Sequence, residues 1–197
     1  MHGRKPSSTS AMNGAERRAT AGLATIFGLR MLGLFLILPV FALYGRDLDG
    51  ATPALIGLAI GAYGLTQAIL QIPFGMLSDR IGRRPVIVFG LLVFALGSGV
   101  AAEAETIHGV IVGRALQGCG AIAAAVMALA ADLTRDRQRT KAMAFIGISV
   151  GAAFMIALVA GPAIAAQAGL SGVFWATAAL AIVAVALLYG VVPAGGE

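Results

Sequence analysis

The chain has 197 residues, of which 59% are apolar and only 12% are charged. An average soluble domain is about 45–50% apolar and about 25% charged, so this chain lacks the charged residues that a water-facing exterior needs. A mean hydropathy of +0.91 also excludes a disordered chain, because disorder requires low hydrophobicity. The composition predicts an integral membrane protein.

Long uncharged stretches recur along the chain, and a helix of about 20 apolar residues crosses the hydrocarbon core of a bilayer. The last stretch, 142–196, is long enough for two spans and is interrupted by Gly169, Ser171 and Gly172. Since the alternating polarity of a membrane barrel is absent, we predict an all-α membrane protein with six transmembrane helices in one bundle. The expected spans are 20–44, 53–77, 85–103, 107–131, 142–166 and 172–192.

The basic residues are distributed asymmetrically around these spans. Of the 14 Lys and Arg residues, 11 lie in the N-terminal tail (1–19), the 78–84 loop and the 132–141 loop, and all three segments are expected on one side. The positive-inside rule therefore places both termini in the cytoplasm, with the bundle (20–192) in the inner membrane and 193–197 beginning a central cytoplasmic loop. Arginines in short loops between spans argue for the lipid bilayer as partner and against nucleic acid.

Catalytic and metal-binding groups are not visible in the sequence. Cys119 is the single cysteine, and His2 and His108 are far apart in the expected topology. Without a Cys/His cluster, a Ser/His/Asp arrangement or a glycine-rich phosphate loop, we expect no enzyme activity, no metal and no other cofactor.

Two arginines, Arg30 and Arg114, lie inside expected spans. A cation at bilayer depth costs about 2.5–3.5 kcal/mol on insertion scales, so each should face the protein interior or a wet cavity. No Asp or Glu lies within a span, which leaves two interpretations: the arginines brace helices, or they line a cationic cavity that binds substrate or tunes proton movement. The cavity and substrate candidates are Arg30, Tyr63, Thr66, Gln67 and Gln71.

The strongest local pattern is the short loop after the second span, Gly75-Met-Leu-Ser-Asp79-Arg-Ile-Gly82-Arg83-Arg84-Pro85. A tight turn here requires a residue that tolerates positive φ, which Gly82 supplies. The Asp79 carboxylate can accept hydrogen bonds from a helix N-terminus, and Arg83 and Arg84 can bind carboxylates or lipid phosphates.

This loop resembles the signature loop between helices 2 and 3 of the major facilitator superfamily. The matching residues are Gly75, Leu77, Asp79, Arg80, Gly82, Arg83 and Arg84, with Ser78 in place of Ala and Arg84 in place of Lys. A second resemblance, to the helix-4 motif of that superfamily, lies in Arg114, Gln117, Gly118 and Gly120. The stretches 29–33, 64–67 and 140–145 are further similar to YajR-type proton-coupled efflux transporters.

The antiporter signature of helix 5 in this superfamily is only partly matched. Gly151, Gly161 and Pro162 agree with it, whereas Ala157, Ala165 and Ala166 stand where the pattern has glycine. The match is compatible with drug/proton antiport without establishing it.

The resemblance implies a twelve-helix transporter of two bundles, of which this chain supplies the N-terminal one, so we expect a truncated chain. Its expected function is transport of a small-molecule substrate by alternating access. The expected direction is efflux, with the proton as the coupling ion. The partner is then the missing C-terminal half or a second copy. The alternative is a homodimerising six-helix protein or an inactive remnant or scaffold without transport.

In the mechanism that the resemblance implies, the loop acts as a conformational latch. Asp79 would hold a helix N-terminus of the other half, and Arg83 would pair with Asp132. For proton coupling three options stay open: an acid in the other half, Asp79 or Asp132, or instead uniport or anion exchange, with Arg30 and Arg114 neutralising an anionic substrate.

Overall fold

The computed structural model describes residues 11–193, so parts of the expected tail and central loop (1–10 and 194–197) lie outside the described residues. The described part contains helices and no strand. The elements are α1 (Gly14–Tyr44), the 3-10 turn η1 (Gly45–Asp47), α2 (Pro53–Ile81), α3 (Arg83–Ala102), α4 (Ile107–Cys119), α5 (Ala123–Asp132) and α6 (Asp136–Gly190).

Local sequence signals set the starts of several helices. Asn13 and Glu16 form a capping box at the start of α1, each side chain accepting from the other residue's backbone N–H at 2.8 Å. Thr52 caps α2, with Pro53 at its first position, and Thr106 caps α4. These caps set the observed starts of α1, α2 and α4 at Gly14, Pro53 and Ile107.

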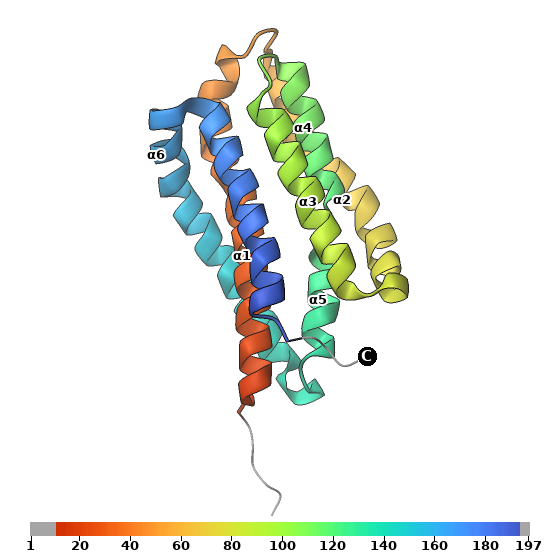
Figure 1. Ribbon diagram of the computed structural model, residues 1–197. Helices are drawn as coiled ribbons and strands as arrows, with labels where there is room; N and C mark the ends of the chain where they lie inside the picture. The colour runs from red at the N-terminus through yellow and green to blue at the C-terminus, as the bar shows by residue number, and fades with distance from the viewer. Residues whose placement is uncertain (1–10, 194–197) are drawn as a thin grey trace, which may run out of the picture.

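Five stretches of the described chain are long and apolar enough to cross a membrane: Gly14–Asp47, Pro53–Ile81, Arg83–Ala102, Ile107–Asp132 and Asp136–Gly190. The all-helical prediction is confirmed, and the expected fifth and sixth spans both fall within one long element in which two helices meet at a kink. Both belong to α6, which contains one non-helical residue, Gly169, with φ 65° and ψ −167°. The chain reverses direction within α6 (Figure 1), so the element has two arms of opposite direction. Glycine is the residue that adopts this positive φ without steric cost.

The expected fourth span corresponds to one apolar stretch, Ile107–Asp132, whose helix is interrupted between α4 and α5. The backbone leaves the helix at Gly120, where φ is −79° and ψ is 49°. A Cβ on Gly120 would lie 2.3 Å from the Gly90 carbonyl oxygen, so the interruption is packed directly against α3.

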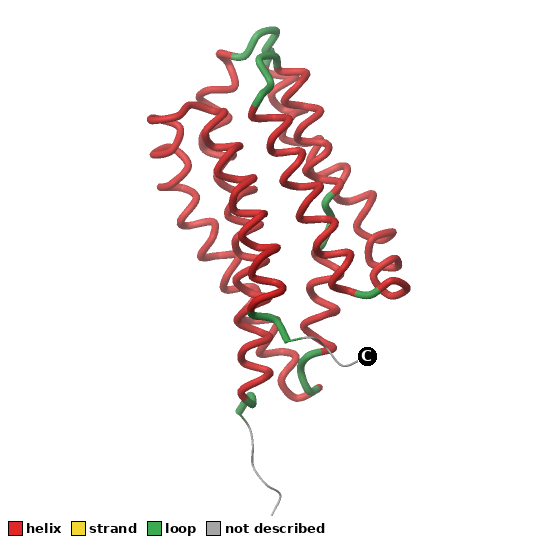
Figure 2. The backbone as a smooth tube through the Cα atoms, viewed as in Figure 1, coloured by secondary structure: helices red, strands yellow, loops and turns green. Residues whose placement is uncertain are grey.

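The helix ends gather into two groups at opposite ends of the bundle. The start of α1, the α2–α3 turn, the α5–α6 turn and the end of α6 lie at one end (Figures 1 and 2). We call this the basic end, because it holds the tail (from residue 11), the 78–84 loop and the 132–141 loop. At the other end, Asp49 joins the α3–α4 connection through Asp49 N to Glu105 O (3.3 Å) and Ile107 N to Asp49 O (3.1 Å).

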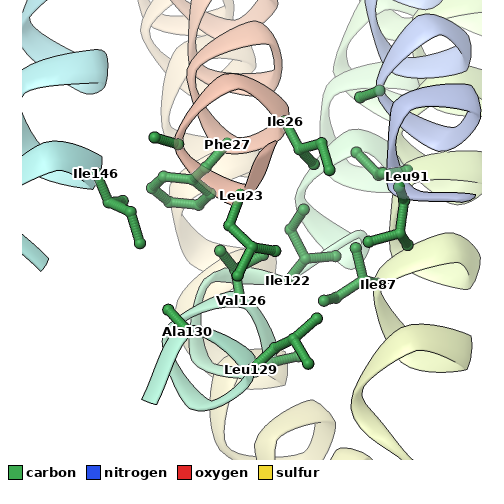
Figure 3. Packing of buried hydrophobic residues seen from close by; sticks show 14 of the residues in the cluster. Leu23, Ile26, Phe27, Ile87, Leu91, Ile122, Val126, Leu129, Ala130 and Ile146 are labelled. Atoms are coloured by element: carbon green, nitrogen blue, oxygen red, sulfur yellow. The ribbon is translucent and has the colours of Figure 1, made fainter. Parts of the chain in front are cut away.

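An apolar core holds α1 in the middle of the bundle. Near the basic end its members come from α1, α3, α5 and α6 (Figure 3), namely Leu23, Ile26, Phe27, Ile87, Leu91, Ile122, Val126, Leu129, Ala130 and Ile146. In the most apolar window of α1, 56% of the residues are buried, against 17% in α2. Helix α1 is therefore central and α2 peripheral.

Candidate functional site

The α2–α3 loop forms a cluster of charges at the basic end. Gly82 takes φ 99°, which allows α3 to start immediately after α2 ends. Across this turn Arg83 forms an ion pair with Asp79, whose side chain is 61% exposed. The positive φ expected at Gly82 is thus present, and it brings the two charges of the loop together.

Arg83 also connects the loop to the end of α5. Its Nε lies 3.3 Å from Asp132 Oδ2, which is the ion pair expected from the resemblance. Its second contact within the loop is a 2.8 Å hydrogen bond to Ser78 Oγ, and Ser78 in turn donates to Gly75 O at 2.7 Å. One guanidinium therefore joins α2, α3 and α5.

Other members of the loop motif have different surroundings. Leu77 and Arg80 are exposed, and a Cβ on Gly75 would lie 3.4 Å from Ala124 on α5. Arg84 donates to the carbonyl oxygen of Val192, just beyond α6. The motif thus touches the end of the last helix as well as α5.

A second arginine at this end of α6 was not found by sequence reasoning. Arg18 donates from Nε to Val191 O at 3.0 Å and from its terminal nitrogen to Gly190 O at 3.2 Å. Because cations favour the carbonyl-rich C-terminus of a helix, Arg18 and Arg84 together stabilise the end of α6. The sequence identifies the tail only as a basic segment. No local pattern around Arg18 indicates a contact with residues 190 and 191.

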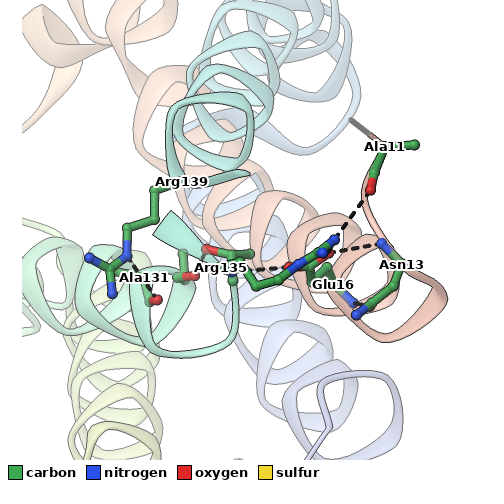
Figure 4. A network of polar contacts seen from close by, with 8 residues as sticks. Ala11, Asn13, Glu16, Ala131, Arg135 and Arg139 are labelled. Carbon is green, nitrogen blue, oxygen red and sulfur yellow. Dashed lines mark hydrogen bonds and ion pairs between the residues drawn. The ribbon is translucent and has the colours of Figure 1, made fainter. Parts of the chain in front are cut away.

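An ion pair between a buried carboxylate and a half-exposed arginine at the same end was also not predicted from the sequence. Glu16 is 3% exposed and accepts from Arg135 Nε at 2.8 Å and from the Arg135 backbone N–H at 3.0 Å (Figure 4). The Glu16 carboxylate raises the pKa of Arg135 through these contacts. The start of α1 is therefore fastened to the loop between α5 and α6.

Inside the bundle, Arg114 is held by groups other than carboxylates. It is 2% exposed, and it donates to Gln117 Oε1 at 2.8 Å and to Ala59 O at 3.3 Å. The side-chain nitrogen of Gln117 in turn donates a hydrogen bond to Ser98 Oγ at 2.7 Å. The helix-4 motif therefore links α4 to both α2 and α3, and Ser98 is a member that the sequence did not identify.

Arg30 lies in the same interior and has no exposed surface. One terminal nitrogen donates to Gly120 O at 2.8 Å and to Gln67 Oε1 at 3.2 Å. Its Nε and its other terminal nitrogen have no hydrogen-bond partner among the described residues. Arg30 thus satisfies a carbonyl freed by the α4–α5 interruption, and it retains unused donors.

Two aromatic rings lie beside these guanidinium groups. The Cζ atom of Arg114 is 4.8 Å from the Tyr63 ring centroid, and that of Arg30 is 5.1 Å from the Phe94 centroid and 6.0 Å from that of Tyr63. A cation over a ring face within about 6 Å is attracted by the ring quadrupole. Tyr63 therefore contacts both arginines and joins them into one interior cluster.

The remaining polar candidates of α2 are distributed around this cluster. Thr66 Oγ1 lies 2.8 Å from Ala115 O on α4, and a Cβ on Gly118 would lie only 2.0 Å from that hydroxyl. Gln71 has a buried Oε1 without a partner in the described part of the chain. Thr66 and Gly118 thus lie where α2 contacts α4. Within residues 11–193, no hydrogen bond joins Gln71 to either arginine.

The helix-5 motif is divided between a packed and an open region of α6. A Cβ on Gly161 would lie 2.5 Å from Leu36 O, so Gly161, followed by Pro162, allows α6 to approach α1 closely. At Gly151 a Cβ would meet nothing within 4 Å. Only the second half of the motif is therefore used within the described bundle.

Residues 23–197 match the family model described as Major Facilitator Superfamily. The chain belongs to the Major Facilitator Superfamily. Proteins of this superfamily are transporters and not enzymes, which agrees with the prediction of no enzyme activity.

Relatives and a solved structure support this membership. The chain is 63% identical over 182 residues to the inner membrane transport protein YajR of Escherichia coli, covering 92% of this chain and 40% of that protein. It is 29% identical over 131 residues to the quinolone resistance protein NorA of Staphylococcus aureus, covering 65% of this chain and 33% of NorA. The human organic anion transporter MFSD10 has the same fold, with a TM-score of 0.77 at 20% identity over 92% of this chain and 48% of that one. The chain therefore spans about half the length of these proteins, or less.

Proposed function

We propose that this chain is one bundle of an alternating-access transporter that exports small molecules in exchange for protons. The observation that carries the proposal is Arg83, which joins Asp79 and Asp132 across three helices at the basic end. The carboxylates are 61% and 55% exposed, so both pairs are weak enough to break and re-form in a transport cycle. YajR is named as an inner membrane transport protein and NorA as a quinolone resistance protein, which supports the transport of small molecules across a membrane.

In this proposal the bundle crosses the membrane six times, with the two arms of α6 counted separately. The basic end faces the cytoplasm, because its loops hold most of the Lys and Arg residues. Both termini are then cytoplasmic.

Transport by rocking of two bundles requires a second bundle, which is either the rest of a longer chain or a second copy. Two small-residue faces are suited to it: a Cβ on Gly57, Gly61 or Gly64 of α2, or on Gly147 or Gly151 of α6, would meet nothing within 4 Å. Exposed apolar side chains accompany both faces, including Ile69 and Ile72 on α2 and Met155 on α6. Such faces allow close helix packing in a membrane.

The proposed test is substrate efflux, driven by a pH gradient, from vesicles that contain this bundle together with its second bundle. Asp79→Asn removes one charge of the loop, and transport is expected to drop about tenfold, as for a coupling of 1–3 kcal/mol, while membrane insertion is unchanged. The matched control is Asp136→Asn, which removes a carboxylate that pairs with Arg139 at the same end. Equal transport by both variants and the unaltered protein would refute the latch.

Proton coupling in this proposal depends on an acid outside the spans of this chain. Arg30 and Arg114 stay charged at physiological pH and are held by carbonyl, amide and ring groups. The proton carrier is then either a residue of the second bundle or Asp79 or Asp132. If neither Asp79→Asn nor Asp132→Asn changes the dependence of transport on the pH gradient, the second bundle remains as the location of the carrier.

A second candidate function is transport of an organic anion. It is favoured by the two donors of Arg30 that have no partner among the described residues, since an arriving carboxylate would use them. The two functions differ in proton movement: exchange for protons changes the pH inside the vesicles, whereas anion export responds to membrane voltage without such a change. Loss of that response in Arg30→Gln, but not in Arg83→Gln, would favour the anion.

A further inference from the structure

A groove of about 450 Å³ lies at the basic end, between the start of α1 and the start of α6. It is separate from both the α2–α3 loop and the interior arginine cluster. Its lining residues are Ala11, Met12, Arg17, Thr20, Ala21, Lys141 and Phe145.

The groove combines two kinds of surface. Arg17 and Lys141 contribute a cation from each side, one on α1 and one on α6. The other lining is mainly apolar, with Met12, Ala21 and Phe145 as its members. A ligand that fits both surfaces has an anionic group and an apolar chain.

An unused hydroxyl group lies in the same lining. Thr20 is 3% exposed, and its Oγ1 has no hydrogen-bond partner among the described residues. A buried hydroxyl without a partner carries a desolvation cost, which an acceptor oxygen of a bound ligand would remove. This observation is independent of the charges and indicates a ligand with oxygen acceptors.

The groove also crosses the expected membrane boundary. Arg17 and Lys141 lie just outside the expected spans that begin at residues 20 and 142, whereas Ala21 and Phe145 lie just inside them. A phospholipid has its phosphate at this depth and its acyl chains immediately deeper. A free phosphate ion would use the cations but leave the apolar lining uncovered.

From these observations we propose that the groove binds one anionic phospholipid. Its phosphate lies between Arg17 and Lys141 and accepts a hydrogen bond from Thr20, and an acyl chain covers Ala21 and Phe145. The bound lipid joins the start of α1 to the start of α6, next to the Glu16–Arg135 ion pair. The proposal does not depend on transport activity or on its coupling.

Native mass spectrometry of the detergent-purified protein tests this proposal with two lipids that have identical chains, dioleoyl-phosphatidylglycerol and dioleoyl-phosphatidylcholine. We expect one phosphatidylglycerol to be retained at least fivefold more tightly than phosphatidylcholine. The double variant Arg17→Gln/Lys141→Gln should weaken phosphatidylglycerol roughly twentyfold, since each basic residue near an anionic lipid contributes about fivefold. Equal retention of the two lipids by the unaltered protein would overturn the proposal.

The matched control is Arg46→Gln/Arg137→Gln, which removes two charges that do not line the groove. Its affinity should change less than twofold, and a loss as large as that of the groove variant would show attraction by diffuse charge only. Displacement of phosphatidylglycerol by glycerol 3-phosphate at similar concentration would instead identify a site for free anions.

A nearly isosteric variant keeps the test independent of folding. Thr20→Val preserves the shape of the side chain and removes the hydroxyl together with its desolvation cost, so the bundle is expected to unfold at the same or a higher temperature. Affinity for phosphatidylglycerol should fall roughly fivefold, the usual effect of one lost hydrogen bond. Unchanged affinity in Thr20→Val would contradict the assigned position of the phosphate.

Discussion

The basic end and the interior of the bundle use arginine in opposite ways. At the basic end, Arg83 pairs with carboxylates that are more than half exposed. In the interior, Arg30 and Arg114 are almost fully buried and donate to carbonyl and amide oxygens without any carboxylate. The same residue type thus forms water-accessible ion pairs at the α2–α3 loop and packed hydrogen bonds in the interior.

This difference separates the part of the bundle that can rearrange from the part that cannot. Exposed ion pairs contribute little free energy and are screened by salt, so they break at low cost. Buried donors cannot leave their acceptors without a desolvation cost for both groups. We therefore expect the α2–α3 loop to change partners during a conformational cycle, while the interior cluster moves as one rigid unit.

Among the variants that test this rigidity, Gly118→Ala is expected to have the largest effect on the free energy of unfolding. An added Cβ would lie 2.3 Å from the Tyr63 carbonyl oxygen as well as against Thr66, so α2 and α4 would have to separate. We expect a loss of about 3 kcal/mol in the free energy of unfolding, as for severe overpacking. Thermal unfolding in detergent measures it, with Gly147→Ala as the matched control, because a Cβ at Gly147 meets nothing within 4 Å. Similar unfolding temperatures for the two variants would show that the interior is loosely packed.

A somewhat smaller effect is expected for Arg30→Ala. The substitution leaves the Gly120 carbonyl oxygen unsatisfied and opens a cavity, but it also removes a buried charge. We expect a net loss of about 2 kcal/mol in unfolding free energy, which denaturant titration can measure. Arg83→Ala should lose less than about 1 kcal/mol in the same assay. The reverse order would abolish the proposed distinction between the two regions.

The sequence predicted the features that depend on neighbouring residues. The loop framework around Gly82 and the interruption near Gly169 follow from local conformational needs, and both are present at the expected positions. The helical class also followed from composition alone. At Gly169 the backbone is non-helical, and the two helical arms of α6 meet there.

Contacts between distant residues were mostly out of reach of the sequence. Arg30 was expected to need a polar partner, but its acceptor, Gly120 O, is 90 residues away and is available only because α4 ends there. Glu16 and Arg135, 119 residues apart, carry no local sign of pairing. Arg83–Asp132 was expected only through family resemblance.

The smallest expected effect concerns that last pair, and a double-mutant cycle with Arg83→Gln and Asp132→Asn measures it. The side chains are 23% and 55% exposed, so the coupling in unfolding free energy should be about 0.5 kcal/mol. It should decrease further in 1 M salt, where the Debye length is about 3 Å. The pair Asp136–Arg139, which is more exposed, provides the reference cycle and should give about 0.3 kcal/mol. A salt-insensitive coupling above about 3 kcal/mol would mean that Arg83 is fixed like the interior arginines, because only a desolvated pair resists screening to that degree.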